Sequence, residues 1–300
     1  MRSLLFVPGD SERKLEKGFA SGADAVIVDL EDSVAAANKQ AARRIAAEFI
    51  GARRHAATLV YVRVNDLSTG LTDDDLAAIV GSRPDGIMLP KSDSGADVQH
   101  LSLKLRVIEA ENGFPDGGIG IIPIITESGA GVLAGGSYHG AGERLKGLTW
   151  GAEDLSAAVG AHATRDADGN YTDVFRFARA VTLLAASAAD VAAIDTVFVN
   201  FRDSEGLRTE CLAAERDGFT AKMAIHPAQV PVINEAFTPS AEALEHAVSV
   251  IEAFAAAGNP GVVGLGGQMY DRPHLRRAER LVKRAHAADL TNRNGGPASA

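Results

Sequence analysis

The sequence predicts an α/β fold: a TIM (β/α)8 barrel followed by a C-terminal helical extension. Short apolar runs rich in β-branched residues alternate with Ala-rich helical segments almost from the first residue. The runs are apolar on consecutive residues, which is typical of parallel strands covered on both faces. Nearly every run ends in a polar or charged residue, and the carboxyl ends of barrel strands converge on one face, where active sites lie.

Eight runs supply the predicted strands. In chain order they span residues 3–8, 25–32, 58–65, 86–91, 119–128, 147–154, 196–201 and 222–227. The segments between them, such as 38–52 and 175–191, have helical spacing and few breakers, and predict the covering helices. A doubly wound open sheet is the competing arrangement. The barrel is favoured because an open sheet would spread the polar strand ends along an edge, where fewer could meet.

The rhythm of strand and helix changes after the last run, and this change predicts the domain boundaries. Residues 1–230 form the predicted catalytic barrel. Residues 231–287 form a helical extension that serves as a lid or oligomerisation element, with its first long helix at about 240–257. Residues 288–300, which end in "TNRNGGPASA", predict a disordered tail.

Composition and charge exclude several classes of protein. A chain of 300 residues buries a large core without a disulfide or metal staple. Its one cysteine, Cys211, excludes an internal disulfide and fits a reducing compartment, so we expect a cytoplasmic protein. The net charge of −9 argues against nucleic-acid binding, and no apolar segment approaches the length of a membrane span.

Two acidic residues mark a candidate metal site. Glu127 and Asp154 end the fifth and sixth predicted strands. Adjacent strands lie about 5 Å apart, so these carboxylates could share one ion. Two carboxylates, with the other positions left to water and substrate oxygens, are typical of Mg²⁺, and Mn²⁺ is the alternative ion. The competing interpretation is that each acid caps the helix that follows it.

Arg63 is a charge inside the apolar run "VYVRVN", and burial requires an anionic partner for it. It either forms a structural ion pair with Glu31 or Asp32, or its planar fork grips a substrate carboxylate or a developing oxyanion. Asp29, Glu31 and Asp32 predict an acidic network around it, in which Glu31 and Asp32 could hold metal-bound waters. Asp32 as a cap for the next helix is an equal alternative.

Other cations lie near the predicted mouth of the barrel. Arg13 and Lys17 are four residues apart on one helical face, with Lys14 nearby, and could meet ligand phosphates; the alternative is a solvated surface. Lys91 follows the fourth predicted strand and could form a Schiff base, but the sequence supplies no desolvating partner for it.

Eight motifs together resemble a known family. In chain order they are SLLFVPGD, AVIVDLEDSV, VRVN, IMLPKSDS, WGAEDLSAAVG, DSEGL, GFTAKMAIHPAQV and GQMYDRP, between residue 2 and about residue 287. They resemble the citrate lyase β-subunit-like group of the HpcH/HpaI aldolase and malyl-CoA lyase superfamily. The resemblance implies a TIM barrel with a C-terminal extension, assembled as a homotrimer or as a hexamer of two trimers.

The resemblance also implies roles for the acidic residues and Arg63. Glu127 and Asp154 match the residues that ligate Mg²⁺, and Arg63 matches the arginine that contacts the substrate. Glu31 and Asp32 match an acidic pair lying behind these ligands.

Further positions match residues that bind the substrate. The backbone of Gly151, Ala152, Glu153 and Asp154 matches the segment that receives the 2-oxoacid carboxylate, and we expect the Glu153 side chain to support it by hydrogen bonding. Asp271 matches an acid–base group that reaches a neighbouring subunit's site. This chain has "GQMYD" where the family usually has "GxMID", and "TESGAG" in place of "xETxxG".

The implied activity is Mg²⁺-dependent carbon–carbon lysis, or formation, of a β-hydroxyacyl-CoA of the malyl-, citramalyl- or citryl-CoA type. Its partners are a CoA thioester, whose phosphates Arg13, Lys14 and Lys17 could contact, and a small 2-oxoacid. The alternatives are a metal-dependent pyruvate aldolase acting on free acids, a CoA thioesterase, and an accessory citrate lyase β subunit that works with an acyl-carrier partner.

Overall fold

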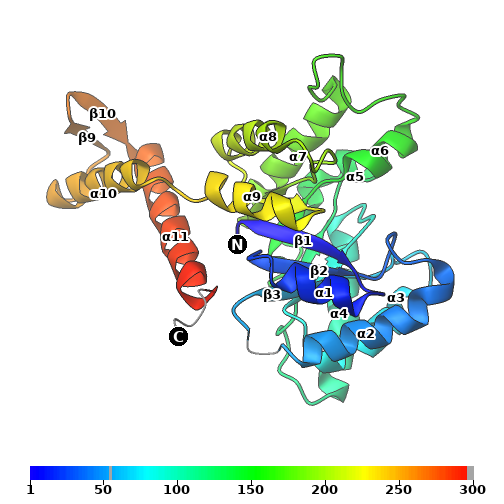
Figure 1. Ribbon diagram of the computed structural model, residues 1–300. Coiled ribbons are helices and arrows are strands. Elements are labelled where there is room, and N and C mark those ends of the chain that lie inside the picture. Colours follow the sequence, from blue (N-terminus) through cyan, green and yellow to red (C-terminus); the bar gives the residue numbers. More distant parts are fainter. Residues whose placement is uncertain (54–55, 296–300) are drawn as a thin grey trace.

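The structure, a computed structural model, describes residues 1–53 and 56–295 and contains a parallel eight-stranded barrel (Figure 1). The sheet order is β5-β4-β3-β2-β1-β8-β7-β6, and bridges from Ile121 to Leu145 and from Ile124 to Thr149 join its two ends. The predicted TIM barrel is therefore confirmed. Its strands are β1 Ser3–Pro8, β2 Ala25–Asp29, β3 Leu59–Arg63, β4 Gly86–Leu89, β5 Gly120–Pro123, β6 Gly147–Thr149, β7 Ala192–Asp195 and β8 Ala221–Ala224.

Helices follow the strands and cover the outside of the barrel. They are α1 Glu12–Phe19, α2 Lys39–Gly51, α3 Thr72–Ile79, α4 Gly95–Glu111, α5 Gly129–Leu133, α6 Ala152–Val159, α7 Asp173–Ala189, α8 Ser204–Asp217 and α9 Val230–Ala236. Short 3-10 turns accompany them at η1 Ala36–Asn38, η2 Val80–Ser82, η3 Gly135–Tyr138 and η4 Pro227–Gln229. Within the described residues, no helix combines the length and hydrophobicity needed to cross a bilayer.

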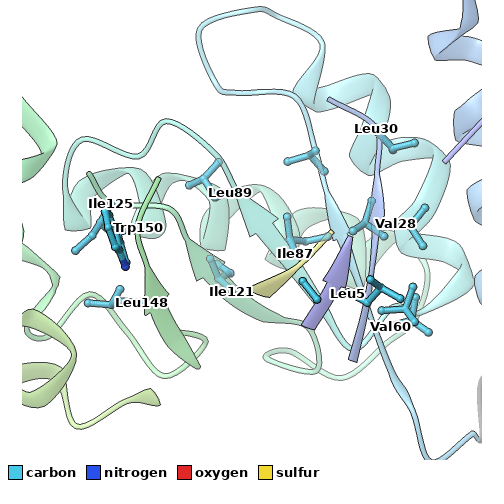
Figure 2. Close-up of a cluster of buried hydrophobic side chains, with 14 of the residues drawn as sticks. Leu5, Val28, Leu30, Val60, Ile87, Leu89, Ile121, Ile125, Leu148 and Trp150 are labelled. Atoms are coloured by element: carbon cyan, nitrogen blue, oxygen red, sulfur yellow. The ribbon is translucent and has the colours of Figure 1, made fainter. Parts of the chain in front are cut away.

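Both faces of the strands are buried, which explains their consecutive apolar residues. One set of alternate side chains packs against the helices, including Leu5, Val28 and Val60 (Figure 2). The other set, which includes Ile27 and Tyr61, forms a separate cluster inside the barrel. Because side chains alternate along a strand, the next inward positions after Ile27 and Tyr61 are Asp29 and Arg63. The pleat therefore directs these two charges into the mouth of the barrel.

The prediction for the seventh strand was wrong by several residues. The strand is Ala192–Asp195, and the predicted run 196–201 is the loop that follows it. Helix α7 ends at Ala189, and the strand begins three residues later. The short run "AAID" (192–195) pairs with β6 and β8, whereas the more hydrophobic run "VFVNF" (197–201) lies beyond the sheet. Val199 and Phe201 are exposed there.

The C-terminal extension projects away from the barrel (Figure 1). It consists of α10 Ala241–Ala256, the antiparallel strands β9 Val262–Leu265 and β10 Gln268–Asp271, and α11 Arg272–Gly295. The hairpin was not predicted, although Gly266 and Gly267, both at positive φ, form the two-residue turn that joins its strands.

Helices lie across both predicted boundaries of the extension. Helix α9 and the residue that follows it place Val230, Ile233 and Phe237 in the core of the barrel, and α10 is the first helix of the projecting part. Helix α11 continues to Gly295, past the start of the predicted tail. Residues 296–300 of that tail lie outside the described residues.

Candidate active site

A cavity of about 310 Å³ opens at the carboxyl ends of the strands. Side chains from seven strand ends line it, as the sequence predicts for a barrel mouth. Its lining includes Phe6, Asp29, Arg63, Glu127, Asp154, Thr196 and Met223.

Arg63 is held by carboxylates inside this cavity. It is the register partner of Asp29 on the adjacent strand, and its Nε and Nη2 donate to the two Asp29 oxygens, both at 2.7 Å. Its Nη1 lies 3.1 Å from Oε2 of Glu31. Burial alone would raise the pKa of Asp29, but the hydrogen bonds and charge of Arg63 outweigh it and hold this pKa below its ordinary value. The predicted ion pair therefore exists, but its main partner is Asp29, while Asp32 is largely exposed.

Lys91 brings the other acidic residues together. Its ammonium donates to Oε1 of Glu31 and lies 3.7 Å from Oδ1 of Asp154 and 3.9 Å from Oδ2 of Asp32. Burial lowers the pKa of Lys91, but the hydrogen bond and charge of Glu31 outweigh burial and raise it. Glu31 is buried, and burial raises its pKa despite both cations. Lys91 is thus an ion-paired group of the site, a role that sequence reasoning missed.

Glu127 is a buried carboxylate, and its burial disfavours the ionised form. It follows β5, is 6% exposed, and its Oε2 accepts a hydrogen bond from the Lys91 backbone N–H. Lys91 has a left-handed φ of 51°, a conformation that non-glycine residues rarely adopt. Burial first, and then the neighbouring negative charge of Asp154, raise the pKa of Glu127 to about 8.

Neither metal-ligand candidate serves as a helix cap. The side chain of Ser128 caps α5, accepting from the N–H of Gly131. Gly151 is the N-cap of α6, where no side chain caps the helix. The capping alternative for Glu127 and Asp154 is therefore wrong.

The amino terminus of α6 faces the cavity. The first N–H groups of a helix have no intrahelical acceptor, and here they belong to Ala152, Glu153 and Asp154, which also line the cavity. Such a terminus attracts carboxylates. The Glu153 side chain is exposed and lines the cavity, and it accepts no hydrogen bond from the described part of the chain, so its support of a bound carboxylate stays a prediction.

Gly151 fixes the approach of this helix to Glu127. A Cβ at residue 151 would lie 3.0 Å from Cγ and 3.3 Å from Oε1 of Glu127. We expect Gly151→Ala to displace the Glu127 carboxylate and to weaken Mg²⁺ binding about tenfold or more, because disturbing the groups that position a metal ligand usually has an effect of this size. Isothermal titration with MgCl₂ measures this, and Gly136→Ala, where the added Cβ meets nothing within 4 Å, is the control. Equal affinity in both variants would contradict the placement of Glu127.

Trp150 forms part of the cavity wall through a buried polar network that sequence reasoning missed. Its indole N–H donates to Asp195 at 2.8 Å, and Asp195 pairs with the fully buried Lys222 at 2.9 Å. Lys222 also reaches Glu210 on α8 at 2.8 Å. The sequence signal for this network was one charged residue in each of two apolar segments, Asp195 in β7 and Lys222 in β8. The network orients the Trp150 indole beside the cavity.

Six predicted site residues do not line the cavity of this chain. Glu31 and Asp32 are two of them, but they lie beside the lining through their contacts with Arg63 and Lys91. Arg13, Lys14 and Lys17 are exposed on α1 and do not line it. Asp271 ends β10 in the extension, where it pairs with His274, and this hydrogen bond lowers its pKa.

Comparison with known proteins agrees with the fold. Residues 2–227 match the family described as HpcH/HpaI aldolase/citrate lyase. The citrate lyase subunit beta of Leuconostoc mesenteroides is 34% identical over 98% of this chain and 96% of its own length. The (3S)-malyl-CoA thioesterase of Cereibacter sphaeroides is 33% identical over 95% of each chain.

Solved structures give the same result. The crystal structure of protein CitE from Mycobacterium tuberculosis, in complex with magnesium, acetoacetate and coenzyme A, has a TM-score of 0.75 and 35% identity, covering 95% of this chain and 98% of that chain. The barrel, its extension and the sequence similarity over nearly the whole length lead to one conclusion: this chain belongs to the HpcH/HpaI aldolase/citrate lyase family.

Proposed function

We propose that the protein is a Mg²⁺-dependent carbon–carbon lyase that cleaves, or forms, a β-hydroxyacyl-CoA of the malyl-, citramalyl- or citryl-CoA type. The observation that carries the proposal is the pair Glu127 and Asp154, two carboxylates at one cavity beside the uncapped start of α6. Relatives named for citrate lyase and malyl-CoA chemistry, and one bound to magnesium and coenzyme A, support it.

The residues present fit a divalent ion. Glu127 is a buried carboxylate whose pKa is raised, so a nearby cation would relieve its cost of ionisation. No set of three or more candidate ligands occurs among residues 1–53 and 56–295, and a two-carboxylate site suits Mg²⁺, with Mn²⁺ as the alternative ion. Bound between Glu127 and Asp154, the ion would supply a Lewis acid that polarises the oxygens of a 2-oxoacid.

The remaining groups bind and stabilise the reactants. The N–H groups at the start of α6 would hold the 2-oxoacid carboxylate. Arg63 is fixed by Asp29, and Nη1 and Nη2 each carry a second N–H with which to stabilise the oxyanion of the thioester enolate left by carbon–carbon cleavage. Glu31 and Lys91 would set the charge around the ligands, and the exposed Arg13, Lys14 and Lys17 remain our candidates for CoA phosphates.

Asp271 would protonate the enolate carbon in the cavity of a second copy of the chain, within a homotrimer or hexamer. Its hairpin lies in the projecting extension, away from its own barrel, and its side chain is half exposed (Figure 1). We expect Glu127→Gln and Asp271→Asn to be inactive alone but to regain activity when mixed. Random mixing should restore about one quarter of the parental rate, because hybrid sites combine an intact Glu127 with an intact Asp271. No recovery after confirmed subunit exchange would contradict the shared site.

Incubation with candidate reactants tests the activity directly. The purified chain with Mg²⁺ should convert malyl-, citramalyl- or citryl-CoA to a 2-oxoacid and acetyl-CoA, detected by mass spectrometry, and EDTA should stop it. No turnover of any of the three, in either direction, would refute the proposal.

Thioester hydrolysis is the second candidate, favoured by the (3S)-malyl-CoA thioesterase relative. The same assay separates the two activities, because hydrolysis releases free CoA and a hydroxy acid, whereas lysis leaves an acyl-CoA. Conversion of pyruvate with an aldehyde, without CoA, would indicate the aldolase. Turnover that requires an added acyl-carrier protein would indicate an accessory subunit.

A further inference from the structure

A second cavity, of about 520 Å³, lies between the barrel and the last helix. The end of α8 and the turn before β8, at Gly218 and Thr220, form its barrel side, and α11 forms the other side. Turns that precede strands lie at the amino ends of the barrel strands. This cleft is therefore on the opposite end of the barrel from the mouth.

The cleft concentrates positive charge in an acidic protein. Its lining contains one carboxylate, Glu215, and five guanidinium groups, those of Arg216, Arg276, Arg277, Arg280 and Arg284. The whole chain carries a net charge of −9. Like charges gathered around one hollow repel one another, so an arrangement of this kind favours a bound anion.

Two of the arginines fasten the helix to the barrel. Arg284 lies 3.2 Å from Glu215 on α8, and Arg280 lies 3.5 Å from Asp190, which follows α7. These pairs link α11 to the barrel at this end and neutralise the carboxylates of Glu215 and Asp190.

The other arginines of the cleft are not neutralised by a close carboxylate of the described chain. Arg276 and Arg277 form no ion pair with any carboxylate in the part of the chain that the structure describes. Among the described residues, Arg216, on the facing side, lies near one carboxylate, that of Asp217 at 3.8 Å. Three guanidinium groups that face the same hollow are therefore available to a ligand.

The placement of the charges indicates the class of ligand. The available arginines lie on both sides of the hollow, Arg276 and Arg277 on α11 and Arg216 at the end of α8, so a ligand that meets all three carries more than one anionic group. A guanidinium fork binds phosphate oxygens in pairs, and the cavity has the volume of a small-molecule site. The lining of the mouth cavity, by contrast, contains four carboxyl groups, those of Asp29, Glu127, Glu153 and Asp154, and one guanidinium group, that of Arg63.

We propose that this cleft is a binding site for a small molecule that carries two or more linked phosphates, held between α8 and α11. Its binding would add an anionic bridge to the Arg280 and Arg284 contacts and hold the extension against the barrel. The site does not depend on the chemistry at the mouth.

Calorimetric titration of the full chain in EDTA and low salt, with sodium tripolyphosphate as the probe, tests the site. We expect binding that Arg276→Ala/Arg277→Ala weakens at least about tenfold, since each variant removes charged hydrogen bonds without breaking an internal ion pair. The control Arg44→Ala/Lys283→Ala removes the same charge from exposed positions outside the cleft and should change affinity less than about twofold. Raising NaCl should weaken binding by the parent.

Titrations with further compounds identify which phosphorylated molecule the cleft binds. ATP and CoA are compared with pantetheine, which lacks phosphate and should not bind. Whichever phosphorylated probe loses affinity in the double variant is the type of molecule that the cleft accepts. Absence of tripolyphosphate binding to the parent, or equal weakening by both double variants, overturns the proposal. Neither result touches the lyase assay, which is run with Mg²⁺ and reports the mouth.

Discussion

Glu127→Gln should abolish turnover while leaving the fold intact. The amide is nearly isosteric but carries no negative charge, so it removes one of the two proposed ligands of the ion. Loss of several kcal/mol of transition-state stabilisation corresponds to a rate at least about a thousandfold lower. Steady-state assay with Mg²⁺ on the active CoA thioester measures it, and Asp154→Asn should behave alike. Glu111→Gln, an exposed carboxylate on α4, is the matched control and should retain full activity.

The same variant has a stability signature that a merely inactive protein would not show. The folded-state pKa of Glu127 is raised from 4.5 to about 8, so the metal-free parent loses stability as pH rises between these values. Glutamine does not ionise, and the variant should therefore melt above the parent at pH 8 and close to it at pH 5. Saturating Mg²⁺ should raise the melting temperature of the parent but not that of the variant. Equal melting of the two metal-free proteins at pH 8 would contradict the buried, charge-strained carboxylate.

Arg63→Met should lower the free energy of unfolding by about 3–5 kcal/mol, because it leaves the buried carboxylates of Asp29 and Glu31 without their main cation. It should also reduce turnover by about 10²–10³-fold, the usual effect of removing an oxyanion donor. Urea unfolding measures the first effect and the steady-state assay the second. Arg44→Met, on the exposed face of α2, should change stability by less than about 0.5 kcal/mol.

Acidic pH supplies the check on this prediction. Arg63 holds the pKa of Asp29 below its ordinary value, so the ion pair contributes stability at neutral pH that is lost as pH falls. The difference between the parent and Arg63→Met should therefore shrink toward acid. A difference that is constant with pH would show that lost packing, and not the Asp29 pair, destabilises the variant.

The barrel could be predicted because its signals are local. Each strand carries consecutive apolar residues, since both faces are buried, and the polar residue at its end marks the mouth. The signal failed at β7, where "AAID" is short and of low hydrophobicity and the neighbouring loop is richer in Val and Phe. It also failed at the hairpin β9–β10, where the apolar run of β9 is only four residues long, is interrupted by Gly264 and is flanked by glycines.

The site followed partly from the same reasoning. Glu127 and Asp154 were predictable as neighbours because adjacent parallel strands place their ends together. The partner of Arg63 was not, since three acids lay within reach along the sequence. The register that pairs Asp29 with Arg63 decides among them.

By itself, then, the sequence determined the barrel, the face that carries the site, and the acidic and basic residues at its strand ends, because periodicity and burial act within a few neighbouring residues. Only the tertiary structure decided that Lys91 lies between Glu31 and Asp154, and that α11 turns its arginines toward α8. These contacts join segments far apart in the chain, and their distances depend on strand register and helix packing, which no local pattern records.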